Sequence, residues 1–464
     1  MPCAWAFATS SDARHCANAL LLSPVSLPDA IMNSSSSHAA PFDTTTPATL
    51  RAEQRRAIGA GMVGYILEWF DFGVYGFLAA IIAKNFFPST DEFTSLLASF
   101  AVFGVGFVAR PIGSVVLGRI ADVRGRHITL ATTMILMAVS TVAIGFLPTY
   151  ESIGIWAPVL LVAARLVQGF AAGGEWGTAA AFLVEWGGAN RRGFFGAFQQ
   201  SSIAAGLLLG SLVAAILSSA LDSNALASWG WRIPFFLGAL LGPVGMYVRR
   251  RVQESPSFES EAARAHTLSG VQFAKSLFHA FSFVIFWAVS SYMVAVYMPT
   301  FANKYAHISR TQALWTSTAS LATVMIVAPL MGALSDRIGR KPVLLASCVF
   351  FALLSYPLYA FIVSGIGFMT FFWTQLLMNV VFAMYSGAGP AALAEMFPTR
   401  VRSTGVAFGG ALATILGGFS PFLTTWMIAS TGASANAGWL LAGSALFTLP
   451  ALVVMNDRAR EKSI

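Results

Sequence analysis

Long apolar segments recur along this chain from residue 57 almost to its C-terminus, and they constrain its fold more than any other feature. Each segment is about 20 residues long, which is the length that a helix needs to cross roughly 30 Å of hydrocarbon. Hydrophobic residues make up 56% of the 464 residues and charged residues only 10%, more apolar surface than a soluble domain of this length can bury. The segments lack the apolar–polar alternation of a membrane β-barrel. We therefore predict an all-α integral membrane protein.

Twelve such segments are distinguishable by length and spacing. We expect membrane spans at residues 57–83, 93–118, 128–148, 155–184, 194–220, 231–249, 276–302, 311–334, 341–363, 367–394, 401–428 and 436–456. The predicted domains are a cytoplasmic N-terminal tail (1–50), an N-terminal six-helix half (51–249), a hydrophilic cytoplasmic linker (250–275), a C-terminal six-helix half (276–456) and a short cytoplasmic tail (457–464). The tail at 1–50 is rich in Ser, Thr and Pro and is predicted to be disordered. Met32 offers an alternative start, so residues 1–31 are either part of this tail or a mis-assigned beginning.

Basic residues concentrate on one side of this topology. The loops expected on the other side contain only Lys84, Lys304 and Arg310 among the 28 lysines and arginines. An excess of Lys and Arg marks cytoplasmic loops, so we predict a multi-pass protein of the plasma (inner) membrane with both termini in the cytoplasm. The net charge of +8 therefore orients the chain in its membrane and does not indicate a nucleic-acid partner.

One loop pattern occurs twice, and each copy joins one apolar segment to the next. Gly118-Arg-Ile-Ala-Asp122-Val-Arg-Gly-Arg126 recurs as Gly332-Ala-Leu-Ser-Asp336-Arg-Ile-Gly-Arg340, and Glu185 and Arg192 recur as Glu395 and Arg402. A membrane protein whose halves repeat each other is most simply a transporter with its site between the halves. We expect Asp122 and Asp336 to cap nearby helix N-termini, and the arginines of the pattern to reach carboxylates such as Glu185 and Glu395. The alternative is a loop that only sets the topology.

The doubled pattern resembles the cytoplasmic loop signature of the major facilitator superfamily. More specific stretches are Glu68-Trp-Phe-Asp71-Phe-Gly, Phe107-Val-Ala-Arg110-Pro-Ile-Gly, Gln168-Gly-Phe-Ala-Ala-Gly-Gly-Glu175 and Trp229-Gly-Trp-Arg232-Ile-Pro. Together they resemble the metabolite:proton symporter family, whose members carry citrate, 2-oxoglutarate, shikimate, proline or betaine. The resemblance implies twelve transmembrane helices in two pseudo-symmetric six-helix halves (the major facilitator fold), alternating access and proton coupling. It also implies that contacts of the doubled loops and their Glu–Arg echoes gate the cytoplasmic face.

Three acids and an arginine are expected inside the membrane, where a charge costs roughly 3 kcal/mol or more and needs a partner or a function. Glu68 and Asp71 share one helix face in the middle of the first span, and together with Glu175 they are the candidates for proton coupling. Arg165, Gln168 and Glu175 form a polar stripe of ~15 Å along the fourth span. A guanidinium group can hold a carboxylate through two hydrogen bonds, so Arg165 is the candidate for substrate binding. Alternatively, Arg165 only neutralises an acid of the first span.

Several further residues have weaker patterns. Arg110 is expected to extend towards the cytoplasmic interface in a structural role. Polar or aromatic candidates for a substrate cavity are Gln168, Gln199, Tyr292, Tyr297, Asn379 and Tyr385. Buried tyrosines more often serve packing, so each of these is an open choice between cavity and core.

Three functions are compatible with these features. The leading prediction is import of a small organic acid, a di- or tricarboxylate such as citrate or 2-oxoglutarate, by proton symport. The second keeps the mechanism and replaces the anion by a zwitterionic osmolyte such as proline or betaine. The third, a membrane receptor or enzyme, lacks support because neither a phosphate-binding glycine loop nor a His-Glu-x-x-His motif occurs. We expect no cofactor and no metal, and a monomer whose partners are its substrate, protons and the lipid bilayer.

Overall fold

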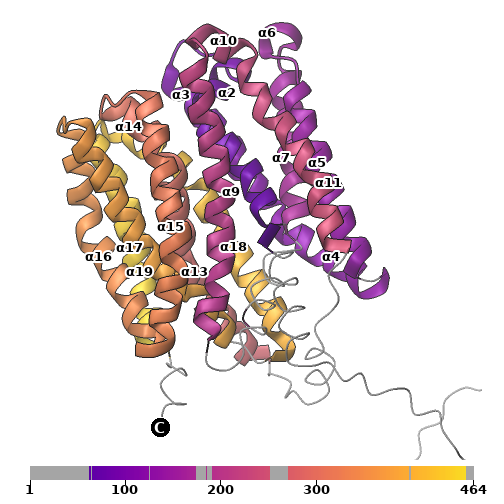
Figure 1. The fold of residues 1–464 in the computed structure, drawn as a ribbon, viewed down its shortest axis with the longest axis vertical. Coiled ribbons are helices and arrows are strands. Elements are labelled where there is room, and N and C mark those ends of the chain that lie inside the picture. Colours follow the sequence, from indigo (N-terminus) through magenta and orange to yellow (C-terminus); the bar gives the residue numbers. More distant parts are fainter. Residues whose placement is uncertain are drawn as a thin grey trace, which may run out of the picture. The chain divides into compact units, whose positions relative to one another are not determined.

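The computed structural model describes residues 62–63, 65–124, 126–173, 184, 191–250, 270–396 and 399–455, with some side chains near the ends of these ranges left out. All of them belong to the compact unit Arg51–Ile464. Regular secondary structure in this described part is entirely helical (Figure 1). The expected domain boundaries remain predictions, because the tail at 1–50 and most of the linker lie outside the described residues.

The described part of the N-terminal half contains seven long helical segments and four short ones. They are the Tyr65–Phe77 helix, α2 (Ala79–Phe86), α3 (Glu92–Val108), α4 (Arg110–Arg124), α5 (Arg126–Phe146), α6 (Tyr150–Ile153), α7 (Trp156–Ala172), α9 (Arg192–Ala220), α10 (Ser223–Ser228), η1 (Gly230–Arg232) and α11 (Ile233–Arg250). The Tyr65–Phe77 helix and α2 form one span with a bend of 63°. The segment Glu92–Leu117, built from α3 and the beginning of α4, is a single apolar span.

The C-terminal half is built in the same way. Its elements are α13 (Gly270–Ser290), a π-helical segment η2 (Ser291–Tyr297), α14 (Met298–Tyr305), α15 (Arg310–Ile338), α16 (Arg340–Val363), α17 (Phe368–Glu395), α18 (Thr399–Thr431), η3 (Ser434–Asn436) and α19 (Ala437–Val454). Gly339 separates α15 from α16 with a φ of 99°. Only glycine adopts this backbone region without cost, which explains the last glycine of the second loop pattern.

The fold class predicted from the sequence is confirmed. Eight described helices are long and apolar enough to cross a membrane, and the bent pair Tyr65–Phe86 makes a ninth. The other three expected spans contain the shorter apolar helices Thr132–Phe146 and Trp156–Ala172 and the helix α11. Together they make the twelve-helix major facilitator fold.

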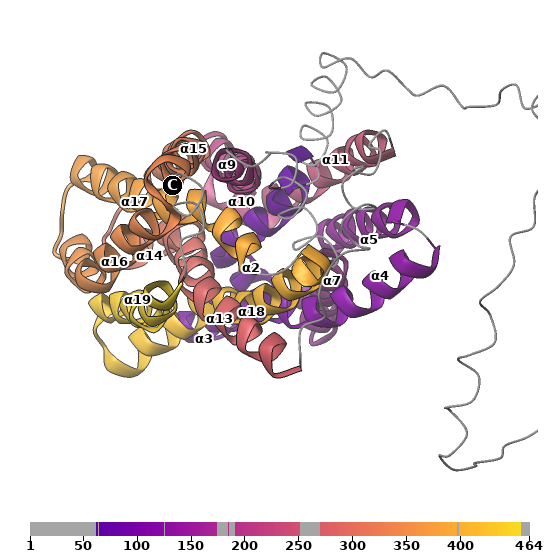
Figure 2. The same cartoon turned by 90° about the horizontal axis from the view of Figure 1, so that it is seen from below.

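The two halves meet along two sets of helices. Helix α9 packs against α15 and α17, and α3 packs against α18 (Figures 1 and 2). We call the end that carries α6, α10 and α14 the outer end and the opposite end, where α9 begins and α15 finishes, the inner end. These names follow the orientation predicted from the basic residues. The centre of the site lies between these ends.

Candidate functional site

A chain of hydrogen bonds joins the arginine of the fourth span to an acid of the first. Arg165 Nη1 donates to Gln168 Oε1 at 3.0 Å, and Gln168 Nε2 donates to Thr141 Oγ1 at 2.8 Å. The Thr141 hydroxyl in turn donates to Asp71 Oδ2 at 2.6 Å. We call these four residues the Arg165 relay. Three helices supply it: the Tyr65–Phe77 helix, α5 and α7.

The relay is enclosed in protein. Arg165 is 1% exposed, and a Cβ added to Gly238 of α11 would lie 2.8 Å from Asp71 Oδ1. Helix α11 therefore approaches the carboxylate as closely as a glycine permits. One donor of Arg165 is unpaired: its Nε has no hydrogen-bond partner in the described part of the chain. The buried guanidinium group can thus still bind an anionic group.

A second arginine pairs with the other acid of the first span. Arg110 Nη2 lies 3.5 Å from Glu68 Oε1, and Arg110 is 2% exposed. The expectation that this side chain extends to the cytoplasmic interface is therefore wrong. Burial among the aromatic rings of Phe72 and Phe107, whose centroids lie 4.7 and 4.5 Å from the guanidinium carbon, stabilises the inward position.

Five aromatic side chains surround these cations, and we call them the aromatic cluster. They are Trp69, Phe72, Phe103, Phe107 and Tyr292. The Phe72 ring contacts both guanidinium groups, at 4.7 Å from that of Arg110 and 4.9 Å from that of Arg165. An aromatic face attracts a cation, so the cluster is suited to positively charged groups.

Tyr292 brings the C-terminal half to this centre. It lies on the π-helical segment η2, and its ring centroid is 5.1 Å from that of Phe107 and 6.1 Å from that of Trp69. Its hydroxyl is buried and has no hydrogen-bond partner among the described residues. π-Helical turns frequently occur at functional sites. Of the weaker candidates in the C-terminal half, Tyr292 is the one that the fold brings to the aromatic cluster.

The side chains of the other weak candidates form hydrogen bonds away from the Arg165 relay and the aromatic cluster. The hydroxyl of Tyr385 donates to the backbone oxygen of Phe283 at 2.7 Å, and that of Tyr297 lies 3.2 Å from the Thr425 hydroxyl. Asn379 Nδ2 donates to the Gln375 backbone oxygen, and Gln199 Nε2 donates to the Tyr65 hydroxyl at 3.4 Å. None of these contacts reaches the Arg165 relay. Glu175, the third acid, lies outside the described residues.

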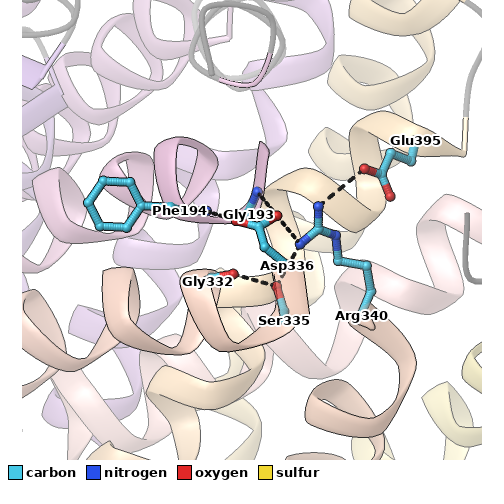
Figure 3. A network of polar contacts seen from close by, with 7 residues as sticks. All are labelled: Gly193, Phe194, Gly332, Ser335, Asp336, Arg340 and Glu395. Carbon is cyan, nitrogen blue, oxygen red and sulfur yellow. Dashed lines mark hydrogen bonds and ion pairs between the residues drawn. The ribbon is translucent and has the colours of Figure 1, made fainter. Parts of the chain in front are cut away.

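The second loop pattern holds the two halves together at the inner end (Figure 3). The carboxylate of Asp336 on α15 accepts hydrogen bonds from the backbone N–H groups of Gly193 and Phe194, both at 2.9 Å. These groups belong to the first turn of α9, so an acid of one half caps a helix of the other. We call Gly193, Phe194, Asp336, Arg340 and Glu395 the inner latch.

Arg340 completes the latch within the C-terminal half. Its Nη1 donates to Asp336 Oδ1 at 2.7 Å and to the Ser335 hydroxyl at 2.8 Å, and its Nη2 lies 3.4 Å from Glu395 Oε1 (Figure 3). The helix cap and the Arg340–Glu395 contact are the two contacts that the sequence predicts for this copy. A Cβ added to Gly332 would lie 2.4 Å from the Gly193 backbone oxygen, so the close approach of α15 and α9 needs a glycine here.

The first copy of the pattern is only partly visible. Gly118, Asp122 and Arg126 lie on α4 and α5, but their side-chain surroundings are outside the described part. The same is true of Arg402 on α18, whereas Glu185 lies outside the described residues entirely. Arg192 is the first residue of α9. The predicted contacts of the first copy therefore stay predictions.

Sequence reasoning missed Thr141, Gly238, Ser335 and the aromatic cluster apart from Tyr292. A threonine hydroxyl in a membrane helix can bond to the backbone of its own helix, so the residue type at position 141 does not predict a hydrogen bond to Asp71. In the described part of the chain, no group of three His, Cys, Asp or Glu side chains is placed to hold a metal ion.

The fold, its two similar halves and the charges buried in its membrane-spanning helices define a secondary transporter. Residues 57–269 match the family model for sugar (and other) transporters, and residues 280–464 match that for the Major Facilitator Superfamily. The chain belongs to the major facilitator superfamily and, within it, to the metabolite:proton symporter family. It is a multi-pass membrane transporter with a small-molecule substrate and is not an enzyme.

Two kinds of relative are similar to this chain. The glycine betaine/proline/ectoine/pipecolic acid transporter OusA of Dickeya dadantii (strain 3937) is 36% identical over 392 residues, which cover 81% of this chain and 78% of the relative. The citrate-proton symporter of Klebsiella pneumoniae is 35% identical over 404 residues, covering 85% and 90%. The structure of the proton:xylose symporter XylE bound to 6-bromo-6-deoxy-D-glucose superimposes with a TM-score of 0.72 at 17% identity, covering 88% of this chain and 97% of that one. This last likeness shows the fold alone.

Proposed function

We propose that this protein imports a small zwitterion of the proline or betaine type together with protons. The observation that carries the proposal is the balance of charge at the centre of the site. Among the described residues, the buried charges there are two carboxylates, Glu68 and Asp71, and two guanidinium groups, Arg110 and Arg165. A site without net charge complements a substrate that carries one positive and one negative group, because a di- or tricarboxylate would leave negative charge uncompensated in low dielectric.

The aromatic cluster supports the same substrate class. Aromatic faces bind ammonium groups, and quaternary ammonium ligands in particular. In this state the cluster is occupied by the guanidinium group of Arg110. We propose that the substrate ammonium takes this place, and that a guanidinium group binds the substrate carboxylate. Both Arg110 and Arg165 have an Nε without a partner in the described chain, which leaves each a donor for that purpose.

Protons supply the driving force in this proposal. A zwitterion carries no net charge, so each co-transported proton moves one elementary charge, worth about 2.3 kcal/mol per 100 mV. That is enough for roughly 50-fold accumulation per proton. Asp71 is our candidate for the proton, since its carboxylate ends the Arg165 relay and protonation would alter every hydrogen bond in it.

The relatives favour the zwitterion, although they include both classes. Several are proline/betaine transporters, among them that of Escherichia coli (strain K12), which is 34% identical over 392 residues. The second candidate function, import of an organic acid such as citrate, is supported by the citrate-proton symporter, which aligns over 90% of its own length. Arg110 and Arg165 would then bind the carboxylates of a substrate that has no ammonium group.

Uptake into proteoliposomes tests the proposal. The purified protein is supplied with labelled betaine, proline, citrate and 2-oxoglutarate under an imposed pH gradient, an inside-negative potential, or both. We expect betaine or proline to accumulate about tenfold or more with both gradients and to respond to either alone. Accumulation of citrate or 2-oxoglutarate without betaine or proline would overturn the zwitterion and establish the second candidate.

A further inference from the structure

A cavity of about 410 Å³ lies between the two halves at the outer end, apart from the Arg165 relay. The N-terminal half supplies one wall from Phe77, α2 and the beginning of α3, and the C-terminal half supplies the other from α14 and the beginning of α15. Figure 1 shows α2, α3 and α14 at this end. Such a volume suits a small metabolite.

Three cations line this cavity. They are Lys84 in the last turn of α2, Lys304 in the last turn of α14 and Arg310 at the start of α15. The sequence predicts only these three lysines and arginines for the outer loops of the whole chain. Residues from three separate segments and both halves thus converge on one cavity, whose lining contains a single acid, Glu92.

The cations are available to a ligand. Within the described chain, none of the three belongs to an ion pair. The Nζ of Lys304 lies 3.9 Å from the centroid of the Phe93 ring and is buried without a hydrogen-bond partner in the described residues. The Phe93 ring and the nearby Glu92 attract this ammonium group but accept none of its hydrogen bonds, so an incoming anion supplies the missing acceptor.

One lining residue of the cavity lies on the helix that carries Asp71. Phe77, which lines it, ends the helix that carries Asp71, about 9 Å away along the helix axis at ~1.5 Å per residue. On the same helix, Tyr75 donates to the Ser99 backbone oxygen and lies 4.5 Å from the Arg165 guanidinium carbon. Along this helix, the residues therefore run from the cavity at Phe77 to the Arg165 contact at Tyr75 and on to Asp71.

We propose that this cavity is a capture site that binds the carboxylate of the substrate before it enters the central site. The proposal rests on the proposed function for the identity of the substrate, but a carboxylate is common to both candidate classes. The positive lining between low-dielectric walls concentrates carboxylates at the mouth of the transporter. It also excludes molecules that have an ammonium group without a carboxylate, such as choline, so selection begins before the aromatic cluster is reached.

A binding assay that needs no transport tests the capture site. The three cysteines, Cys3, Cys16 and Cys348, are replaced by serine, and an environment-sensitive dye is attached at Thr90→Cys, an exposed lining position. Betaine, proline and citrate are titrated separately, with choline as the matched compound that lacks a carboxylate. We expect a saturable response to at least one carboxylate and none to choline.

Variants then identify the cations. Lys304→Gln and Arg310→Gln should raise the half-saturating concentration about tenfold, as expected for loss of one charge-assisted hydrogen bond. Lys304→Arg should retain binding, which separates loss of charge from misfolding. Lys275→Gln, on α13 and outside the cavity lining, is the control and should change nothing. In uptake assays the two Gln variants should raise KM and preserve the maximal rate.

The outcomes separate the two proposals. If the parent imports citrate and not betaine while the dye responds to citrate through Lys304 and Arg310, the zwitterion proposal fails and the capture site stands. If the parent imports betaine or proline and the dye shows no carboxylate response, or one that both Gln variants preserve, the capture site is overturned. A choline response equal to that of betaine would also overturn it.

Discussion

Asp71 and Arg165 are linked through two neutral side chains and not through a direct ion pair. Because Gln168 donates to the Thr141 hydroxyl, that hydroxyl must direct its own proton to Asp71. The four residues therefore act as one unit, and a change in charge at either end alters the hydrogen bonds of the other.

Thr141→Val should break the hydrogen-bond link between Gln168 and Asp71, because valine has nearly the same shape as threonine and lacks the hydroxyl. The variant leaves a buried carboxylate without its donor, which costs about 1–3 kcal/mol, so proton-driven uptake should fall roughly 10- to 100-fold. Thr141→Ser should retain most activity. The neighbouring Ser140→Ala is a matched control, because the Ser140 hydroxyl donates only within its own helix. Equal uptake by Thr141→Val and Ser140→Ala would disprove the relay.

Arg165 and Asp71 should have separable roles. Arg165→Lys should weaken substrate binding about tenfold or more, because an ammonium group cannot reproduce the two parallel donors of a guanidinium group. Asp71→Asn should abolish accumulation against a gradient and preserve exchange of substrate across the membrane, since a group that cannot titrate no longer carries the proton. Counterflow and proton-driven uptake measured in the same vesicles distinguish the two effects. If Asp71→Asn accumulates substrate as the parent does, another residue carries the proton.

At the scale of elements, the inner latch depends on a helix of one half being capped by the other. The first N–H groups of α9 have no partner in their own helix, and Asp336 of α15 supplies it. The two halves are therefore joined at the inner end by a capping interaction, and this interaction is lost whenever α9 and α15 separate.

Asp336→Ala should slow the transport cycle and leave substrate binding nearly unchanged. A capping side chain contributes about 0.5–2 kcal/mol, so its loss would shift the balance between the closed and open inner end by roughly 2- to 30-fold. The matched control is Asp222→Ala, which removes a cap from α10 that involves one half only. Turnover in proteoliposomes and equilibrium binding of the substrate are compared. A turnover equal to that of Asp222→Ala would mean that the latch does not limit the cycle.

The cap of α3 at the outer end should respond to pH. Asp91 accepts hydrogen bonds from the Thr94 hydroxyl and from the backbone N–H groups of Phe93 and Thr94, and these hold the pKa of its carboxyl below its ordinary value. A lowered pKa in the folded state stabilises the protein above the unfolded pKa, and this contribution disappears as the pH falls through the folded pKa. Asp91→Ala should therefore lower the thermal midpoint at neutral pH and approach the parent in acid. For Asp91→Asn, which does not titrate, the difference from Asp91→Ala should be independent of pH.

For the whole molecule, the structure combines a latch between the halves at the inner end with a cavity at the outer end. The inner latch holds α9 against α15, while the cavity separates α2 and α14. This is the arrangement expected of a transporter that receives its substrate from outside. In the import cycle that we propose, the latch opens as the outer cavity closes.

The orientation of the molecule in its membrane is testable directly. We expect a cysteine at Ser257, in the basic linker, and one at Thr90, beside the outer cavity, to be accessible from opposite sides of intact cells. An impermeant thiol reagent added outside should label Thr90→Cys in a background without other cysteines, and Ser257→Cys only after the cells are permeabilised. Labelling of both from outside would contradict the assignment.

The sequence by itself determined the features that depend on length, charge and local spacing. Apolar segments long enough to span the bilayer required a helical membrane protein, and the repeated pattern with Asp336 and Arg340 four residues apart predicted the cap and its arginine. These features can be predicted because lipid permits few backbone structures and because residues four apart in a loop pattern stay close in space.

The tertiary structure alone decided which helix faces adjoin. It turned Arg110 inward to Glu68, placed Thr141 beside Asp71, and brought Lys84, Lys304 and Arg310 to one cavity. In a membrane, lipid is as apolar as the protein core, so a helix carries little pattern that separates its lipid face from its packed face. Close packing of helices selects those neighbours, and the site exists only once that packing is complete.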